Sequence, residues 1–425
     1  MSLRGRRPRL QRVQNTLKKH NKTLAQPEAH RFALEREGGD CLQSRTMKLE
    51  ILSEGFVRRC EPGRIAAQPR CAVTADDDVV CHYVMQSKLG QNDFEPWWSR
   101  SSDGGNAWTH ERLWPHLRQR WSIIGAAGSG PKGELVWFGS RFSIDQPGES
   151  FWCDATQGLK ANDMIWGRSL DGGRTWSEPV AIPHPIPGSA EVCTPMCVTR
   201  RGEWLGCYAP YNTFDPDLKV PRNQVIALAS ADEGKTWQHS AMLRFPHPDS
   251  TAAGSSVAEL SDGRLLGVAW HINEMFPSDP PNAYALSLDG GRSWGPTLST
   301  EILGQSTGLA PLPYGRVLFI YNQRKHGEIG VWLALAKPTE TDFGLIANQI
   351  IWRAERPTLH GTSGKHSEWT DLAFGAPSIV VLPDGKLLAT LWCHQPSGTG
   401  IRYVVLRGRG PAAQSSPASG AAKSA

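Results

Sequence analysis

The sequence predicts an all-β chain folded as a six-bladed β-propeller, and two repeated patterns with one flanking segment indicate this fold. An octapeptide of the form Ser-x-Asp-x-Gly-x-x-Trp occurs four times, at residues 101–108, 169–176, 230–237 and 287–294. The copies follow one another at intervals of roughly 60 residues, somewhat longer than the repeats of about 40 to 50 residues usual for a propeller blade. Each interval can hold four short strands and one long loop, so each octapeptide marks one blade.

Each octapeptide is typical of a tight turn between two strands. Its Asp side chain can accept hydrogen bonds from nearby backbone amides, its Gly can adopt positive φ, and its Trp can pack against the blade. We therefore expect these Asp, Gly and Trp residues to stabilise turns rather than to carry out chemistry.

A second pattern, Asp-Gly or Tyr-Gly between apolar residues, predicts a hairpin between the first and second strands of a blade. It occurs at residues 260–266, 312–318 and 382–388, and residues 75–80 and 199–204 occupy the same place in their intervals. These hairpins allow blades to be counted where the octapeptide is absent. The count predicts six blades, at residues 61–115, 116–185, 186–247, 248–300, 301–356 and 366–408.

The last predicted blade has three strands, which leaves its outer edge unpaired. The alternating segment 48–54 precedes blade 1 and is expected to supply the fourth strand that closes the ring. We therefore place the propeller at residues 47–409.

The two ends of the chain show no strand pattern. Residues 1–46 carry many charges and are expected to be disordered, or to be translated upstream of a true start at Met47. Residues 410–425 are rich in Ala, Ser, Pro and Gly and are expected to form a disordered tail, because such a segment buries too little apolar surface to fold.

Composition argues against several partners. The chain has 46 Lys and Arg against 41 Asp and Glu, and the excess lies mostly within residues 4–22, so the propeller is close to neutral and no nucleic-acid partner is expected. No apolar stretch has the length of a signal peptide or a membrane span, so we expect no membrane partner and a cytoplasmic protein. The nine cysteines are scattered and suggest reduced thiols rather than disulfides or a zinc site.

The octapeptide resembles the Asp-box, or BNR repeat, of the sialidase superfamily, and the resemblance covers residues 47–408. It implies that the boxes join third and fourth strands on one face of a propeller, and that function lies on the other face. Strand alternation agrees, because first-to-second hairpins must share the face of the boxes, so the long second-to-third loops gather on the opposite face.

The resemblance also implies a catalytic pattern of three arginines, a tyrosine nucleophile with a glutamate partner, and an aspartate acid/base. Asp93 and Arg324 stand at matching positions. Ala67 and Trp270 stand where two of the arginines are expected, unless Arg64 or Arg70 substitutes for the first of them. Phe374 begins the blade that carries the tyrosine and stands where the tyrosine is expected. We therefore expect the protein not to release sialic acid from ordinary α-linked sialosides.

The predicted working face collects carboxylates, arginines and tryptophans, which suit an enzyme acting on the end of a carbohydrate chain. Glu191 and Tyr211 are among its polar residues. The candidate catalytic residues are Asp93, Glu149 and Glu368. The candidate substrate-binding residues are Arg70, Arg324, His326, His271, Asn322, Gln305, Trp152, Asp163 and Arg402.

Four loop histidines in blades 4 to 6 leave a divalent metal site open: His271, His326, His366 and His394. Together with Gln305 or Glu368 they could ligate a metal, although exposed loop histidines are the favoured interpretation and no cofactor is expected.

The leading functional hypothesis is an exo-acting glycoside hydrolase on an acidic or acetylated glycan. One alternative is a propeller lyase that uses His or Tyr as base and Arg324 to neutralise a uronate carboxylate. The other is a non-catalytic carbohydrate-binding propeller.

Overall fold

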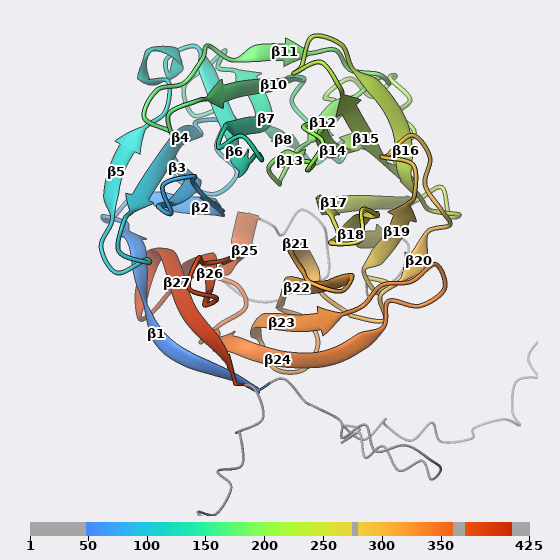
Figure 1. Ribbon diagram of the computed structural model, residues 1–425. Helices are drawn as coiled ribbons and strands as arrows, with labels where there is room; N and C mark the ends of the chain where they lie inside the picture. Colours follow the sequence, from blue (N-terminus) through green and yellow to red (C-terminus); the bar gives the residue numbers. More distant parts are fainter. Residues whose placement is uncertain (1–47, 274–278, 360–369, 410–425) are drawn as a thin grey trace, which may run out of the picture. The chain divides into compact units, whose positions relative to one another are not determined.

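The computed structural model describes residues 48–273, 279–359 and 370–409. The chain divides into two units, Met1–Ser44, which lies outside the described residues, and Arg45–Ala425. The predictions for residues 1–46 and 410–425, and those for His366 and Glu368, also fall outside the described residues. The described part of the second unit is a ring of six sheets, which confirms the predicted all-β six-bladed propeller (Figure 1).

Each blade is an antiparallel sheet whose first strand lies nearest the axis of the ring (Figure 1). Blade 1 is β2 (Ile65–Val73), β3 (Val79–Gln86), β4 (Glu95–Ser101) and β5 (Thr109–Arg112); blade 2 is β6 (Trp121–Ser129), β7 (Leu135–Ser143), β10 (Asn162–Ser169) and β11 (Val180–Ile182). In blade 3 the first strand is split into β12 (Ser189–Glu191) and β13 (Cys197–Val198), which both pair with β14 (Trp204–Tyr211), followed by β15 (Gln224–Ser230) and β16 (Gln238–Arg244).

The remaining blades repeat this order. Blade 4 is β17 (Ser250–Glu259), β18 (Leu265–Asn273), β19 (Ala283–Ser287) and β20 (Leu298–Ser299); blade 5 is β21 (Gln305–Leu312), β22 (Arg316–Gln323), β23 (Gly330–Ala336) and β24 (Leu345–Arg353). Blade 6 is β25 (Phe374–Val381), β26 (Leu387–Gln395), β27 (Gly398–Arg409) and β1 (Lys48–Arg59). The 3₁₀ turn η1 (Pro115–Leu117) and the hairpin of β8 (Trp152–Cys153) and β9 (Gly158–Leu159) lie in the connections. In the described ranges no helix is long and apolar enough to cross a membrane.

The N-terminal strand closes the ring by completing the last blade. β1 pairs antiparallel with β27, from Lys48 opposite Arg409 to Arg59 opposite Gly400. The strand is longer than the predicted segment 48–54, and two register shifts, near Ser53 and near Phe56, bend it along its partner.

The second strand of each blade lies deep in the core. Every residue of β3 and of β14 is buried, because neighbouring blades cover both faces of the sheet. These strands therefore read as largely apolar runs such as Trp204–Tyr211 rather than as alternating patterns.

The four octapeptides form turns that join the third and fourth strands of blades 1 to 4. In the first, Asp103 Oδ1 accepts a hydrogen bond from the Ala107 amide at 2.9 Å, and Ser101 Oγ accepts one from the Gly105 amide at 2.8 Å. The Trp108 indole donates to the Gly105 carbonyl at 3.0 Å. The Ser and Asp hydrogen bonds recur in the turns at 169–176, 230–237 and 287–294.

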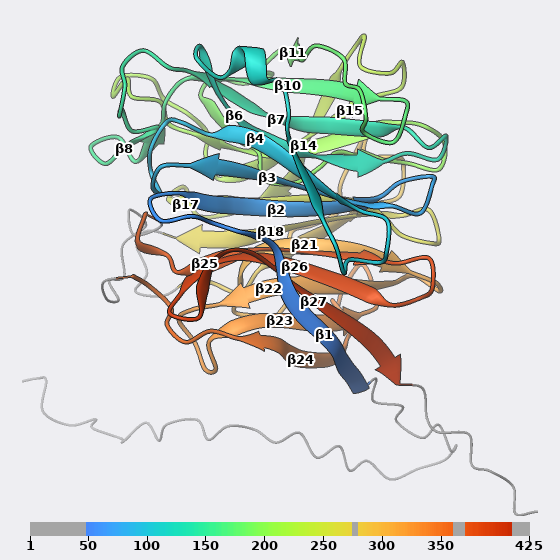
Figure 2. The same ribbon diagram turned by 90° about the vertical axis from the view of Figure 1, so that its left-hand side faces the viewer.

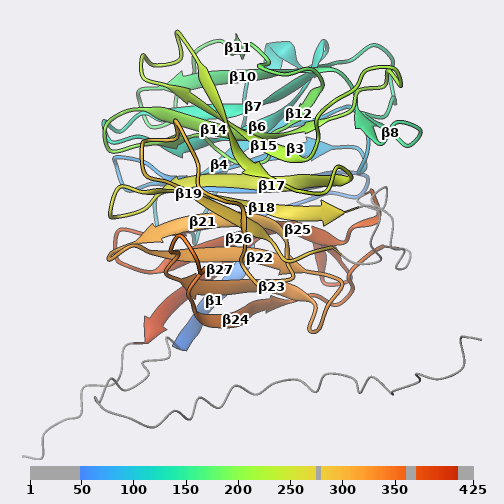
Figure 3. The same cartoon turned by 90° about the vertical axis from the view of Figure 1, so that its right-hand side faces the viewer.

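The octapeptide turns share one face with the first-to-second hairpins. The Arg174 guanidinium of the second turn donates to Asp76 Oδ2, in the hairpin of blade 1, at 3.4 Å. The second-to-third connections, including the β8–β9 hairpin that projects from one side of the ring, therefore belong to the opposite face, called here the loop face (Figures 2 and 3).

Candidate functional site

A cavity of about 160 Å³ lies on the loop face, where first strands begin and second strands end. We call it the loop-face pocket, and all six blades contribute to it. The first-strand positions in its lining include Ala67, Ile124, Ala190, Ala253, Ser306 and Ala376. The lining near or beyond the ends of second strands includes Gln86, Phe142, Tyr211, Trp270, Arg324 and Trp392.

The walls of the pocket are largely aromatic. Phe94, Phe142 and Phe151 form a cluster with ring centroids 4.9 to 6.2 Å apart. Trp152 meets Tyr211 edge-on at 6.2 Å. Such walls, with a few convergent polar groups, are typical of small-molecule sites.

Four first strands enter the pocket with the same backbone irregularity. A register shift separates Ala67 from Arg70, Ala253 from Ser256, Gln305 from Thr307, and Gly375 from Ser378. Within the shifts, φ is positive at Gln68, Gly254, Ser306 and Ala376, with values of 57°, 55°, 43° and 45°. All four of these residues line the pocket. Because a bulge of this kind changes the direction of a strand and its side chains, the shared irregularity shapes the pocket floor.

Arg324 follows β22 and supplies the cation of the pocket. It is 5% exposed; its Nε donates to Gln305 Oε1 at 2.9 Å and its Nη1 to the Phe374 carbonyl at 2.6 Å. Its Nη2 is buried and has no hydrogen-bond partner among the described residues. Burial lowers the pKa of Arg324, to about 9, and Asp279 acts in the opposite direction, so the side chain stays charged at neutral pH.

Asp279 connects the arginine with an aromatic wall. Its Oδ2 accepts a hydrogen bond from the Trp270 indole at 3.0 Å and forms an ion pair with Lys325 Nζ at 3.3 Å. Asp279 thereby fixes the orientation of Trp270 and adds negative charge near Arg324.

Glu191 ends β12 at the pocket. Its Oε1 accepts hydrogen bonds from the Cys193 thiol and, at 3.1 Å, from the Gly254 amide, whereas its Oε2 is buried without a hydrogen-bond partner among the described residues. Burial raises the pKa of Glu191 against the lowering effects of Cys193, the Gly254 amide and Arg70.

The candidate catalytic residues Asp93 and Glu149 lie in loops and are absent from the pocket lining. Asp93 accepts the Ser87 amide at 3.1 Å. Glu149 Oε1 accepts hydrogen bonds from Lys160 Nζ and Asn92 Nδ2, both at 2.6 Å. Burial acts to raise the pKa of Glu149, but these hydrogen bonds outweigh it and lower the pKa. Both carboxylates hold loops together, because their partners are groups of the same or neighbouring loops.

Four candidate substrate-binding residues lie at or around the pocket. Trp152 and Arg324 line it. Gln305 accepts the hydrogen bond of Arg324 Nε, and the buried Asn322 donates to Gln305 at 3.5 Å. Gln305 and Asn322 therefore position the arginine and do not line the pocket themselves.

The other candidate substrate-binding residues have partners elsewhere. His271 stacks on Phe245 at 4.2 Å, and burial lowers its pKa to about 4. His326 borders a small separate cavity with Asp279.

Three further candidates engage side chains or backbone of the fold. Asp163 pairs with Arg141 at 2.9 Å, and the Arg402 guanidinium lies 4.6 Å from the ring centroid of Phe56. Arg70 donates to the Ala376 carbonyl at 2.7 Å, which links blade 1 to blade 6.

The described residues, which include His271, His326 and His394 but not His366, do not form a metal site. Among them, no group of three or more His, Cys, Asp or Glu side chains could hold a metal ion.

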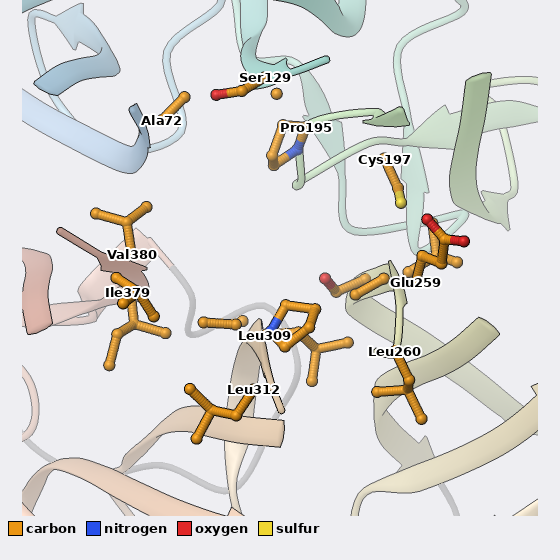
Figure 4. A pocket seen from close by; sticks show the side chains of 18 of the residues that line it. Ala72, Ser129, Pro195, Cys197, Glu259, Leu260, Leu309, Leu312, Ile379 and Val380 are labelled. Atoms are coloured by element: carbon orange, nitrogen blue, oxygen red, sulfur yellow. The ribbon is translucent and has the colours of Figure 1, made fainter. Parts of the chain in front are cut away.

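A larger cavity of about 1,140 Å³ opens at the face of the octapeptide turns. The side chains labelled around it in Figure 4 are mostly aliphatic, among them Pro195, Leu309 and Ile379, with Glu259 as an acidic exception. Charged side chains such as Arg200, Glu259 and Lys337 also line this wide cavity. The smaller loop-face pocket is the better candidate site because its walls are largely aromatic and it encloses a buried arginine and a buried carboxyl group.

Sequence reasoning noted Glu191 and Tyr211 as polar residues of blade 3 but did not select either as a site residue, and it missed Cys193, Asp279 and Trp392. Glu191 carries one signal, a lone carboxylate at the start of a first strand. The break between β12 and β13 that places Glu191 in the pocket, and the bulges that shape the pocket in four other blades, share no residue type that a sequence pattern could detect.

No protein-family profile matches this sequence. A sialidase of Bacteroides fragilis is 24% identical over 214 residues, which cover 46% of this chain and 36% of that protein, so the chain spans about a third of its relative. Among solved structures, a Dyadobacter fermentans protein of unknown function has a TM-score of 0.68 at 19% identity, with 85% of this chain and 99% of that chain covered. The Hadza microbial sialidase Hz136 has a TM-score of 0.57 at 16% identity, with 80% and 65% covered. The chain therefore has the six-bladed propeller fold of the sialidase superfamily.

Proposed function

We propose that this protein is an exo-acting glycoside hydrolase that removes a terminal acidic sugar, and that the loop-face pocket is its active site. The observation that carries the proposal is Arg324, a buried arginine that lines the pocket and has one guanidinium nitrogen without a partner among the described residues.

The surroundings of Arg324 favour an anionic ligand. Its two hydrogen-bond acceptors, the Gln305 amide and the Phe374 carbonyl, are neutral. Among the described residues it forms no ion pair, and Asp279 acts on it only at longer range. A buried cation with neutral neighbours is strongly stabilised by an anion, and a guanidinium suits the two oxygens of a carboxylate.

The size and walls of the pocket favour a single sugar unit. Its volume of about 160 Å³ is below the roughly 300 to 1,000 Å³ of sites for drug-sized ligands. Trp152, Trp270 and Trp392 supply aromatic surface on different blades. Two of the similar proteins are sialidases by name, which favours a carbohydrate as the ligand.

The pocket differs from the arginine pattern that the resemblance implies. Arg324 is the one arginine in its described lining, and Ala67 and Trp270 line it where arginines are expected. We therefore predict no turnover of a fluorogenic α-linked sialoside by the wild-type protein. Robust release of the fluorophore that is abolished in Arg324→Ala would contradict this prediction, because it would show that Arg324 binds sialic acid together with residues other than those at the positions of Ala67 and Trp270.

The proposal is tested by comparing an acid with its neutral analogue. Calorimetry should show that glucuronic acid or N-acetylneuraminic acid binds at least tenfold more tightly than glucuronamide or the sialic acid methyl ester. Arg324→Ala should abolish this preference, because the buried cation is lost. Arg168→Ala is the matched control, since Arg168 pairs with Glu233 at an octapeptide turn.

Equal binding of acid and neutral analogue by the wild type, or a preference that survives Arg324→Ala, would contradict the proposal. A product with a new carbon–carbon double bond would instead support the lyase, and tight binding without turnover of any glycoside would support a binding propeller.

A further inference from the structure

We propose that Glu191 is the proton donor of the loop-face pocket, and that Cys193 and the Gly254 amide fix which of its two oxygens carries the proton. This inference rests on the proposed function, because a proton donor is needed only if the pocket cleaves a glycosidic bond.

The fold brings Glu191 to the pocket by interrupting a first strand. Glu191 pairs with Ala209 of β14, after which the chain leaves the sheet and rejoins it at Cys197. Blade 3 therefore lacks the continuous strand found in the other blades, and the break places Glu191, Val192 and Cys193 in the pocket lining.

The hydrogen bonds distinguish the two carboxyl oxygens. Oε1 accepts from two donors, the Cys193 thiol and the Gly254 amide. A proton on Oε1 would face these donors, so the proton belongs on Oε2, which has no partner among the described residues. An ionised Oε2 would be a buried charge without a hydrogen bond, which is costly, whereas a protonated Oε2 can donate to a ligand.

The groups around Glu191 agree with a neutral carboxyl. Burial raises the pKa of Glu191, and it also raises the pKa values of Cys193 and Tyr211, so the thiol keeps the proton that it donates to Oε1. Arg70 of β2 is the nearby cation; its Nη1 donates to backbone carbonyls of blade 6, and no ion pair joins it to Glu191 within the described chain. Cys207 of β14 is a further thiol whose pKa burial raises, to about 12.

The chemistry follows from this arrangement. The proton on Oε2 passes to the glycosidic oxygen as the bond from that oxygen to the anomeric carbon breaks, and the bonding pair stays with the oxygen of the leaving alcohol. A water molecule adds its oxygen to the anomeric carbon, and one of its protons returns to Oε2. The carboxyl group is regenerated, and the net reaction is hydrolysis.

Infrared spectroscopy tests the protonation state without a known substrate. At pH 7 the wild type should show the carbonyl stretch of a protonated carboxyl group that is missing in Glu191→Gln. Cys193→Ala, which keeps the carboxyl group but removes a donor to Oε1, should shift this band, and Cys193→Ser should largely restore it. Absence of the band from the wild type overturns the inference, even if Glu191→Gln does not fold.

Binding and turnover separate this inference from the proposed function. Glu191→Gln should keep the preference for glucuronic acid over glucuronamide, yet lose about 10²- to 10⁴-fold in kcat on those 4-methylumbelliferyl uronides that the wild type hydrolyses. Cys193→Ala should lower kcat more than it changes KM and should shift the alkaline limb of the pH profile. If the wild type binds glucuronic acid no more tightly than glucuronamide, the proposed function is wrong. If the wild type and Glu191→Gln both prefer glucuronic acid and have the same kcat, only the role of Glu191 is wrong.

Discussion

At the scale of single residues, Asp279 controls two features of the pocket at once. It accepts the indole hydrogen bond of Trp270 and contributes negative charge near Arg324. A negative charge at this position competes with a ligand carboxylate for the field of the arginine. The affinity of the pocket for acids is therefore set by Asp279 as well as by the arginine itself.

We predict that Asp279→Asn tightens binding of glucuronic acid by about two- to fivefold, because it removes a partly screened charge but keeps an acceptor for Trp270. Binding of glucuronamide should stay the same. Asp279→Ala should weaken both ligands by releasing the indole. Calorimetry with the two ligands checks this, and a weaker acid affinity in Asp279→Asn would contradict it.

The residues of the site were unequally accessible from sequence. Arg324 and Asp93 stand at positions that the resemblance identifies, and Trp152 is a candidate because a tryptophan ring can stack on a sugar. Glu149 is a candidate only as a carboxylate in a loop of the predicted working face. In the structure both Asp93 and Glu149 are hydrogen-bonded to groups of their own surroundings. Whether a loop carboxylate faces a pocket or a neighbouring amide depends on side-chain packing, which residue type alone does not report.

At the scale of structural elements, the octapeptide turns were predictable because their geometry depends on particular side chains. Ser, Asp, Gly and Trp each satisfy a defined backbone need in the turn, so the residues recur wherever the turn recurs. The bulges in β2, β17, β21 and β25 recur just as regularly, yet positive φ falls on Gln, Gly, Ser and Ala. Because four different residue types adopt this conformation, the bulges cannot be recognised from the sequence.

The turns also make the fold sensitive to acid. Hydrogen bonds from Thr236 and Ser293 lower the pKa values of Asp232 and Asp289, each to about 2. A carboxyl group with a depressed folded pKa stabilises the fold above its unfolded pKa, about 3.9, and loses that contribution as the pH falls through the folded value. The thermal midpoint of the wild type should therefore fall between about pH 4 and pH 2.

The matched variant is Asp232→Asn with Asp289→Asn. It should be less stable than the wild type at pH 7, and the difference between the two thermal midpoints should shrink towards pH 2, where the wild-type carboxylates themselves become protonated. A difference that is the same at pH 7 and pH 2 would show that the charge of these residues is irrelevant to the turns.

At the scale of the whole molecule, stability depends on the seam between β1 and β27. Blade 6 takes three strands from the end of the chain and one from its beginning, so this seam holds the ring shut. Val57 of β1 is buried, and Phe56 packs against the core of blades 5 and 6. The fold could be predicted from sequence to this level because blade counting left one strand missing and one segment unassigned.

We predict that a chain beginning at Cys60, which lacks β1, loses cooperative thermal unfolding, because β27 is left with an unpaired edge and the core under β1 is opened. A chain beginning at Met47 is the matched control and should keep the wild-type midpoint. A synthetic peptide of residues 47–59 should restore folding of the shortened chain by adding the missing strand. Equal thermal midpoints for the two shortened chains would disprove the importance of the seam.

The same seam sets a waiting time during synthesis. About 340 residues separate the end of β1 from the start of β27, so a ribosome adding about 5 to 20 residues per second needs roughly 17 to 70 s to make the partner strand. Throughout that interval β1, with its exposed Ile51 and Leu52, leaves the exit tunnel ahead of every blade and has no sheet to join. The nascent chain therefore carries an available strand edge for most of its production, and the demand on holding chaperones should concentrate on these first residues of the propeller.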